Sequence, residues 1–495
     1  MTTSSNETNS PRRETSLLFG FIPLVPAAFL GLGIYRAWIE VVFVGSFVDL
    51  PPLSGAATGN LFNVRDIFDA TMAAVSLMCA LCAKRIGPLS ERKAPFTIGV
   101  ICLTLSTVLM FSSRFIPGET LLVGTAAAIA GGVGIAFLIL IWSELYGCLN
   151  PLRVATYYSL AIVAGAIIVF IWRGFMFPWL FVMTSLLPLA SILCARKGFA
   201  SLPSDERPQR SWAGLSVPWK AIILMATYAF SYGLLETTTY SGLFGPHSAP
   251  GALIAALVVF FAVSARGKRF NFGGIYRVAL PLMIAALLFV PSLKIFGSAA
   301  GGFCVAAGYT AQSILVMVVL TNLCYRYGAS ALWLFGIERG VRQIAMLAGR
   351  AVQNQATHLE SFGIDGAMLI SMLSVIAIVS ATMIFMSERG LSSTWGAKLP
   401  EDGEPGQPSA SRTRHELSSR VAQVARTYKL SAREEEVLLL LAQRKTVGVI
   451  ERELFIANGT AKAHVRHIYQ KLDIHTRQEL FDMVGVEADD GQDPR

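Results

Sequence analysis

The chain has 495 residues, of which 54% are hydrophobic and 15% are charged. Soluble globular domains are about 45–50% apolar and about 25% charged, so this composition excludes a wholly soluble protein. The formal net charge of +9 comes from residues 1–386, whereas residues 387–495 are close to neutral. This distribution indicates basic loops beside a membrane rather than a uniformly basic surface for nucleic acid. The seven cysteines all lie in the apolar part and predict no disulfide framework.

The first 386 residues consist of a short polar tail followed by apolar segments. The tail, residues 1–15, is expected to be cytoplasmic and has no signal-peptide cleavage site. A transmembrane helix needs about 20 apolar residues. On that criterion residues 16–386 form a polytopic membrane domain. Its roughly twelve spans are expected at 16–35, 63–83, 95–112, 120–145, 154–172, 175–195, 218–238, 250–265, 277–293, 299–323, 331–353 and 366–386.

The placement of Lys and Arg predicts the orientation of these spans. An even number of spans puts both termini on one side of the bilayer, and most basic residues fall in the segments that would then be cytoplasmic. The chain is therefore expected in the inner (cytoplasmic) cell membrane with both termini inside. The basic residues expected in outer segments are Arg36, Arg65, Arg114, Arg173, Lys294 and Arg350.

The longest expected internal loop, residues 196–219, divides the spans into six plus six. This layout resembles the major facilitator transporter architecture, in which two six-helix halves surround a cavity near the midplane of the bilayer. The resemblance rests on the number of spans and the lengths of the loops, and the basic loop 83–93 agrees with it only loosely. It implies an all-α membrane domain with a cavity between its halves.

Charged side chains inside expected spans are costly to bury and therefore suggest functional roles. Two interpretations stay open: they are interfacial or paired structural charges, or some of them line a cavity for a ligand or ions. Arg36 and Glu40 are expected to follow the first span, and Asp66 and Asp69 to lie near the outer end of the second. The candidate ligand residues are Arg36, Asp66, Asp69, Glu236, Glu338 and Arg339.

The composition changes after residue 386. Residues 387–424 are rich in Gly, Pro, Ser and charged side chains, which cannot bury a core, so they predict a flexible linker. Helical signals return in residues 425–490, which are expected to form a small cytoplasmic four-helix domain. Capping boxes mark the start of its first and last helices, formed by Ser431 with Glu434 and by Thr476 with Glu479.

Two short helices are predicted between these capping boxes, at 447–454 and 459–472. The apolar stripe of the second helix consists of Ala461, Val465, Ile468 and Leu472. Lys462 and Arg466 therefore lie on its opposite, outward face. Two short helices with a basic outward face follow the helix-turn-helix plan, in which the second helix enters the major groove of DNA. The alternative is a basic face that is merely solvated.

Residues 430–480 resemble the LuxR-type (LuxR/FixJ) DNA-binding domain. The pattern L-[ST]-x-R-E-x-E-V-L-x-L-L-A matches from Leu430 to Ala442, and the pattern T-V-K-x-H-x-x-x-I-x-x-K-L matches from Thr460 to Leu472 with Ala461 for Val. The resemblance implies recognition of double-stranded DNA by the third helix and homodimerisation through the fourth. The residues it implies at the DNA are Lys462, Ala463 and Arg466 on the bases and Thr460, His464 and Lys471 near the backbone.

Several residues depart from the family pattern, Arg444 and Gly448 among them, and Arg477 is given a structural role. Arg444 stands where the family usually has a glycine after the first helix. Gly448 lies inside the short second helix, where glycine costs about 1 kcal/mol relative to alanine. Arg477 is expected to be a structural residue at the start of the fourth helix. These departures leave the expected fold unchanged.

A DNA-binding domain joined to a membrane bundle predicts a membrane-embedded one-component transcription regulator. The bundle would sense an unknown small-molecule or physical signal, and RNA polymerase is a further candidate partner. The alternative is a secondary transporter with a regulatory DNA-binding tail, in which Asp66, Asp69 and Glu236 would couple ions. The sequence contains no catalytic constellation, cofactor motif or metal-ligand motif, so neither an enzyme nor a cofactor is expected.

Overall fold

The computed structural model describes residues 25–44, 47, 63–116, 119–203, 206–208, 217–239, 245, 247–266, 279–285, 298–359, 366–385, 409–454 and 458–485. Every regular element in these ranges is helical, which confirms the expected all-α class. The expected tail 1–15, most of the expected span 277–293 and most of the expected linker lie outside them.

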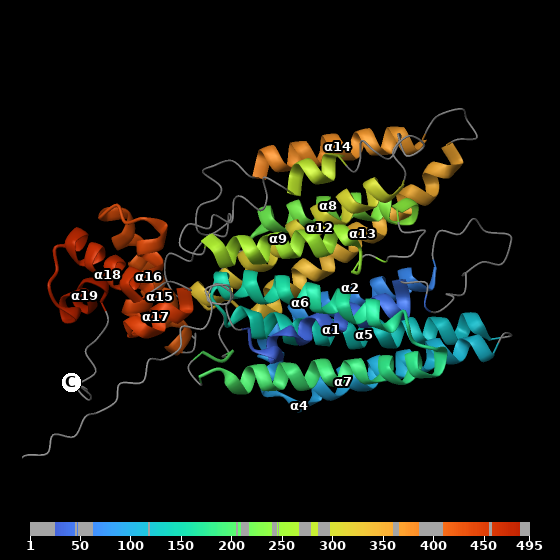
Figure 1. The fold of residues 1–495 in the computed structure, drawn as a ribbon, viewed down its shortest axis with the longest axis horizontal. Coiled ribbons are helices and arrows are strands. Elements are labelled where there is room, and N and C mark those ends of the chain that lie inside the picture. Colours follow the sequence, from blue (N-terminus) through green and yellow to red (C-terminus); the bar gives the residue numbers. More distant parts are fainter. Residues whose placement is uncertain are drawn as a thin grey trace, which may run out of the picture.

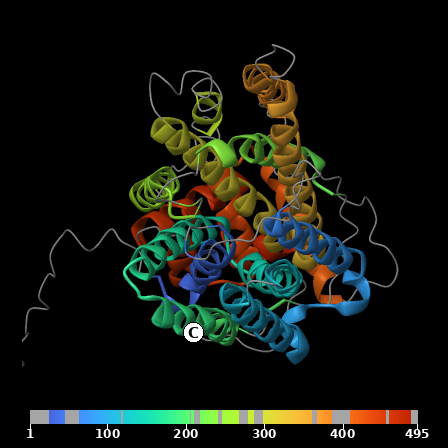
Figure 2. The same ribbon diagram turned by 90° about the vertical axis from the view of Figure 1, so that its right-hand side faces the viewer.

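The membrane domain consists of two groups of helices packed side by side (Figure 1). The first group contains α1 (Gly31–Ile39), α2 (Val64–Leu81), α4 (Lys93–Ser112), α5 (Thr120–Gly147), α6 (Pro151–Trp172) and α7 (Phe177–Ser201). The second contains α8 (Trp219–Thr239), α9 (Pro250–Arg266), α12 (Ser298–Tyr327), α13 (Ala331–Leu359) and α14 (Gly366–Phe385). Figure 2, viewed along the long axis, separates the two groups, which meet where α2 and α5 pack on α13 and α6 packs on α9 and α12.

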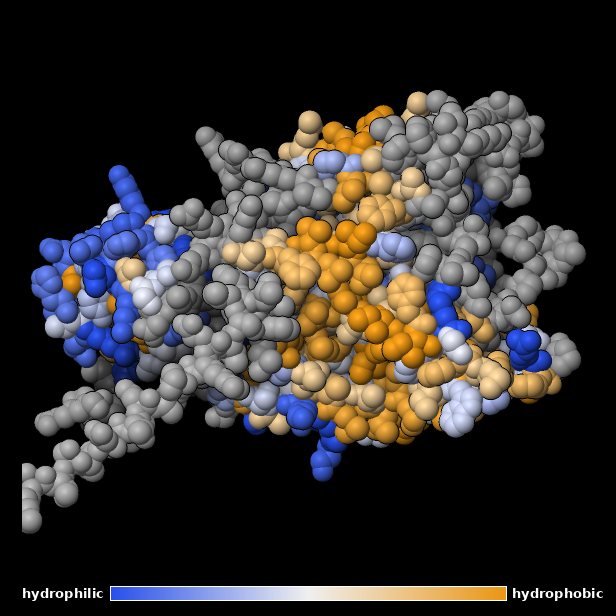
Figure 3. All heavy atoms as spheres, in the orientation of Figure 1, coloured by the Kyte–Doolittle hydropathy of each residue, from blue (hydrophilic) through white to orange (hydrophobic). Residues whose placement is uncertain are grey.

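The outer surface of the membrane domain is apolar. On α7 the exposed large side chains are Trp179, Val182, Leu186, Leu189 and Leu193. Their spacing of three and four residues places them on one face of the helix. A broad apolar region covers the visible side of the bundle, whereas the described C-terminal part is hydrophilic (Figure 3). This surface fits a domain whose solvent is lipid.

Six of the described helices are long and apolar enough to cross a bilayer. The segment Val64–Leu81 with Ala83–Glu91, bent by 66°, makes a seventh if it counts as one span. The chain is therefore a multi-pass membrane protein. The expected total of about twelve spans stays a prediction.

The first span differs from its expected position. It begins with a 3-10 helix, η1 (Ala27–Leu30), continues as α1 and ends in a π-helical turn, η2 (Glu40–Val44). The expected end at residue 35 is wrong, and Arg36 and Glu40 lie within the helix rather than after it. Glu40 is fully buried. The backbone N–H groups of His247 and Ser248 donate to its carboxylate at 2.7 and 2.8 Å and compensate for the loss of water. A window of local hydropathy cannot register this compensation from a distant segment.

Glycines bring α8 and α13 into close contact. A Cβ atom on Gly233 would lie 2.3 Å from the carbonyl oxygen of Met346, and one on Gly349 would lie 2.2 Å from that of Phe230. Both distances are too short for any larger residue, as in other closely packed membrane helices. The contact sets Glu236, one turn after Gly233, beside Arg350, which follows Gly349.

The C-terminal domain has a hydrophobic core of its own. Its helices are α15 (Ser409–Thr427), α16 (Ala432–Ala442), α17 (Val447–Leu454), α18 (Asn458–Leu472) and α19 (Arg477–Val484). The last four match the expected four-helix domain. The expected linker 387–424 is wrong in its final part, because residues 409–424 belong to α15. Val421 is buried in the core of the domain, so tertiary packing stabilises a helix that composition alone does not predict.

Candidate nucleic-acid interface and a buried charge network

The helix α18 has the two faces that its sequence predicts. Ala461, Ile468 and Leu472 are buried in the core of the domain. Lys462 and Arg466, one turn apart, are exposed on the other side. In Figure 1 this helix lies farther from the bundle than α15. An exposed, basic and rigid helix face has the shape and charge to enter a major groove, where arginine pairs with guanine.

The other residues expected at the DNA differ from Lys462 and Arg466 in exposure or in having a partner. Thr460, Ala463 and His464 are half-buried on α18. Lys471 donates a hydrogen bond of 2.7 Å to Glu434 of α16, so its ammonium group already has an anionic partner. Contact of Lys471 with a DNA phosphate would compete with this ion pair.

Glu434 connects the start of α16 to the end of α18. Its carboxylate accepts from the backbone N–H of Ser431 at 2.7 Å, and its own N–H donates to the Ser431 hydroxyl, completing the expected capping box. Burial acts to raise the pKa of the Glu434 carboxyl, but hydrogen bonds from Lys471 and Ser431 outweigh it and hold the pKa below its ordinary value of 4.5. Glu434 thus stabilises the domain in its ionised form.

The substitution Glu434→Gln is expected to destabilise the C-terminal domain at pH 7 by about 1 kcal/mol, the typical contribution of a helix cap. The pKa of Glu434 is lower in the folded state, so its contribution is complete above pH 4.5 and is lost as pH falls through the folded-state pKa. Pulse proteolysis in urea of both proteins, from pH 7 downward, measures the difference. A difference that stays constant at all pH values below 4.5 would contradict this assignment.

The turn after α16 requires a left-handed residue. Arg444 has a φ of 61°, and the N–H groups of Arg444 and Lys445 donate to the carbonyls of Leu441 and Leu440. This is the C-terminal motif that glycine usually occupies. The Arg444 and Arg477 guanidinium groups lie 5.2 and 5.4 Å from the centre of the Phe481 ring. Arg477 also donates to the carbonyl of Lys445, which fits its expected structural role.

The substitution Gly448→Ala is expected to stabilise the C-terminal domain by about 1 kcal/mol, because alanine loses less backbone entropy in a helix. A Cβ atom at this position of α17 meets no atom within 4 Å, so nothing opposes the gain. The urea midpoint of the domain in the full-length protein should rise. An unchanged or lower midpoint would show that α17 does not gain from higher helix propensity.

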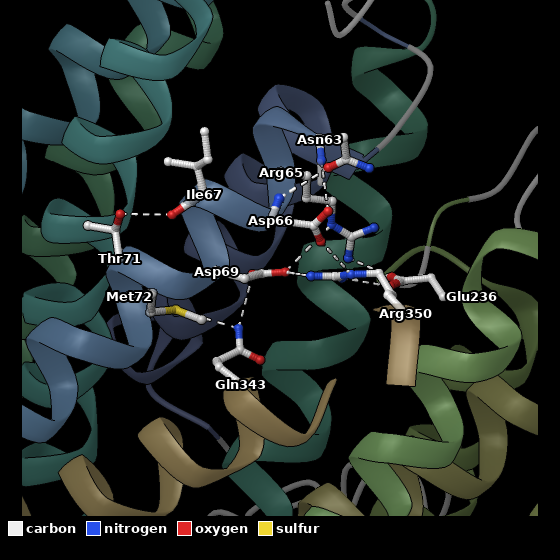
Figure 4. A network of polar contacts seen from close by, with 10 residues as sticks. All are labelled: Asn63, Arg65, Asp66, Ile67, Asp69, Thr71, Met72, Glu236, Gln343 and Arg350. Atoms are coloured by element: carbon white, nitrogen blue, oxygen red, sulfur yellow. Dashed lines mark hydrogen bonds and ion pairs between the residues drawn. The ribbon is translucent and has the colours of Figure 1, made fainter. Parts of the chain in front are cut away.

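A network of buried ion pairs joins the two halves of the membrane domain (Figure 4). The guanidinium of Arg350 on α13 lies 2.8 Å from Asp66 and 2.9 Å from Glu236, and also pairs with Asp69. Arg65 lies 2.5 Å from Glu236. Three of the candidate ligand residues are therefore paired with arginines that connect α2, α8 and α13.

This network changes the roles expected for two residues. Arg350 was expected in an outer segment, but it is 4% exposed within α13. Asp66 also caps α2, because its carboxylate accepts from the N–H of Asn63 while the Asn63 side chain accepts from the N–H of Asp66. Gln343, absent from the expected set, donates to Asp69 at 3.1 Å. Only the fold brings these partners together.

A second cluster lies about two to three turns before Arg350 on α13. Glu338 accepts a hydrogen bond of 2.6 Å from Arg342, and its other oxygen lies 3.4 Å from Nε of Arg339. Arg342 also donates to Ser313, whose hydroxyl contacts that of Tyr158 at 3.2 Å across the two halves. Arg36 on α1 lines the same region. The candidate ligand residues thus fall into two groups, one with Asp66, Asp69 and Glu236 and one with Arg36, Glu338 and Arg339.

The geometry of the C-terminal domain defines a class of DNA-binding module, and comparison with known proteins agrees. Residues 428–484 match the family of bacterial regulatory proteins, luxR family. This part of the chain is a LuxR-type helix-turn-helix domain. A 62-residue stretch is 42% identical to the probable transcriptional regulatory protein NarL of Mycobacterium tuberculosis. The match covers 12% of this chain and 28% of that protein.

The membrane domain is similar to solved transporter structures. The Escherichia coli fucose:proton symporter FucP is 14% identical, with a TM-score of 0.44 over 72% of this chain and 96% of that one. The major facilitator superfamily proton:xylose symporter XylE is 12% identical, with a TM-score of 0.47 over 73% and 94%.

Proposed function

We propose that the chain is a membrane-embedded one-component transcription regulator, in which the helical bundle senses a signal and α18 reads double-stranded DNA. It would reside in the inner cell membrane with both termini cytoplasmic and act as a homodimer on its operator. The observation that carries the proposal is a set of contacts between the DNA-binding domain and one end of the bundle. A tethered module that only needed to be near the membrane would not require them.

The contacts centre on Arg326, at the end of α12. Its guanidinium lies 3.1 Å from Glu435 and 3.8 Å from Glu436 of α16, and its carbonyl accepts a hydrogen bond from the hydroxyl of Ser418 on α15. Lys445 adds a second ion pair, 2.7 Å from Glu206, in the segment that connects the two halves. Each of these side chains is at least half-buried, and each takes part in a contact across the junction. The domain is therefore docked in a defined position.

The helix α12 links this junction to the interior of the bundle. Its middle part contributes Tyr309, Thr310 and Ser313 to the cavity between the halves, and its last turn carries Arg326. A helix is stiff over this length, so a displacement caused at the cavity is transmitted to the docked domain. This gives the signal a physical route that a flexible linker lacks.

Docking leaves the DNA-reading surface accessible. The contacts use α15, α16 and Lys445, whereas Lys462 and Arg466 of α18 remain exposed. Gln478 and Asp482 on α19 are exposed as well, so dimerisation through this helix is compatible with docking. We infer that the signal changes the position or dimerisation of docked domains rather than uncovering a hidden recognition helix. RNA polymerase is the partner such a regulator would finally affect.

A charge exchange tests the proposed coupling. The variant Arg326→Glu would place three carboxylates together, and the expected loss is about 1 kcal/mol, a fivefold shift in docking. Transcription from a target promoter should move away from its wild-type level at equal protein abundance. The double variant Arg326→Glu/Glu435→Arg restores opposite charges and should return the output toward wild type. Unchanged output in the single variant would show that docking does not control transcription.

A further inference from the structure

A cavity of about 90 Å³ lies between the two halves, where α1 and α2 face α12 and α13. One water molecule needs about 10–15 Å³ of such space, so the cavity accommodates a molecule of about six to nine non-hydrogen atoms. Its walls are rich in arginine and tyrosine. The lining residues that matter here are Tyr35, Arg36, Tyr232, Tyr309, Arg339 and Arg342.

Among the described residues, positive charge exceeds negative charge where Arg36, Arg339 and Arg342 line this cavity. Arg339 and Arg342 are 8% and 6% exposed and share a single carboxylate, Glu338. Nε of Arg36 is buried and has no hydrogen-bond partner among the residues that the structure describes. In this cluster the described residues thus contribute three guanidinium groups and one carboxylate.

The neighbouring network removes only part of this excess. It contributes Arg65 and Arg350 against Asp66, Asp69 and Glu236, so two cations face three anions. Among the residues that the structure describes, the two clusters together hold five guanidinium groups and four carboxylates, which leaves one positive charge. Buried charges without partners are strongly unfavourable, and arginine does not lose its proton to relieve the cost. An anion in the cavity would compensate this charge.

We propose that the cavity is a binding site for a small organic anion whose acid group lies between Arg36, Arg339 and Arg342. Guanidinium groups bind carboxylates through paired hydrogen bonds, and Nε of Arg339 has no protein hydrogen-bond partner within the described residues. The rings of Tyr232 and Tyr309, with centroids 4.3 Å apart, form an adjacent aromatic wall. This wall suits an apolar body better than an inorganic ion. A cationic ligand is disfavoured by the arginines.

The role of the anion as the signal rests on the proposed function. Arg36 belongs to the first half, while Arg339 and Arg342 belong to the second. An anion between them would replace repulsion across the interface with attraction and draw the halves together. Because α12 lines this cavity and carries Arg326, the change would reach the docked domain. The ligand thus binds two arrangements of the bundle with different affinities, as a signal must.

Three probes of nearly equal shape test the binding site on the purified full-length protein: benzoate, benzyl alcohol and benzylammonium. We expect the melting temperature of the membrane domain to rise with benzoate up to about 10 mM and not with the neutral or cationic probe. Equal responses to all three, or no response to benzoate, would overturn the proposal.

Two substitutions locate the effect. Arg36→Gln should abolish the benzoate response, and Arg36→Lys should retain part of it. Without ligand, Arg36→Gln should melt at the same temperature as wild type or higher, because it removes an uncompensated charge. Lower ligand-free stability would instead mark Arg36 as a structural residue and contradict the proposal. The exposed Arg85→Gln serves as the matched control and should respond to benzoate as wild type does.

Failure of this site and failure of the proposed function give different results. Benzoate binding that depends on Arg36, with promoter output unaffected by Arg36→Gln, would keep the anion site and reject its role as a sensor. Absence of binding, with output still altered by Arg326→Glu, would reject the anion site and keep the coupling between bundle and DNA-binding domain.

Discussion

Replacing Arg350 with leucine is expected to destabilise the membrane domain by about 3–5 kcal/mol, the usual cost of removing one partner from a buried ion pair. The Arg350 side chain is 5% exposed and pairs with three carboxylates on two other helices. Without it, Arg65 would be the arginine left beside these carboxylates among the residues that the structure describes. Thermal melting of the purified protein in detergent should show a lower transition temperature for the membrane domain.

Two further variants make this prediction specific. Arg350→Leu/Asp69→Leu removes one charge of each sign and should recover part of the loss. Arg85→Leu changes an exposed arginine and should have little effect. If the transition temperature of Arg350→Leu equals that of the wild-type protein, the network does not hold α2, α8 and α13 together. Its carboxylates would then be available for ion coupling, as the transporter alternative requires.

The double substitution Lys462→Ala/Arg466→Ala is expected to abolish specific DNA binding. Each base contact of this kind contributes about 1–3 kcal/mol, and each lost phosphate contact lowers the salt dependence of the affinity by about one unit. Titration of the full-length protein with operator DNA at several salt concentrations separates these roles. Lys429→Gln, which changes an exposed lysine outside α18, should bind as wild type does. Equal affinity of the double variant and wild type would remove α18 from the interface.

The DNA-binding domain could be predicted closely because its signals are local. The capping residues Ser431 and Thr476 and the apolar stripe of α18 lie within a few turns of the elements they determine. The helices begin and end within one or two residues of the expected positions. The hydrogen bond between Glu434 and Lys471 was not predicted, because it joins residues on two helices whose packing the local pattern does not specify.

The charge network could be predicted only in part. Burial costs identified Asp66, Asp69 and Glu236 as unusual, but their partner Arg350 was placed in an outer segment. Asp69 and Arg350 are separated by 281 positions in the chain, and no local pattern links them. For the same reason Glu40 was placed after the first span. Composition likewise predicted a linker over residues 409–424, where packing against α16 supports α15.

The most direct test of the central claim is genome-wide DNA occupancy of the intact protein in its membrane, measured beside the Lys462→Ala/Arg466→Ala variant. The proposed regulator predicts discrete sites for the intact chain and their loss in the variant at equal abundance. The same sites should remain occupied with Lys429→Gln. Occupancy that is absent from the intact protein, or unchanged in the variant, would contradict a membrane-embedded regulator that reads DNA through α18.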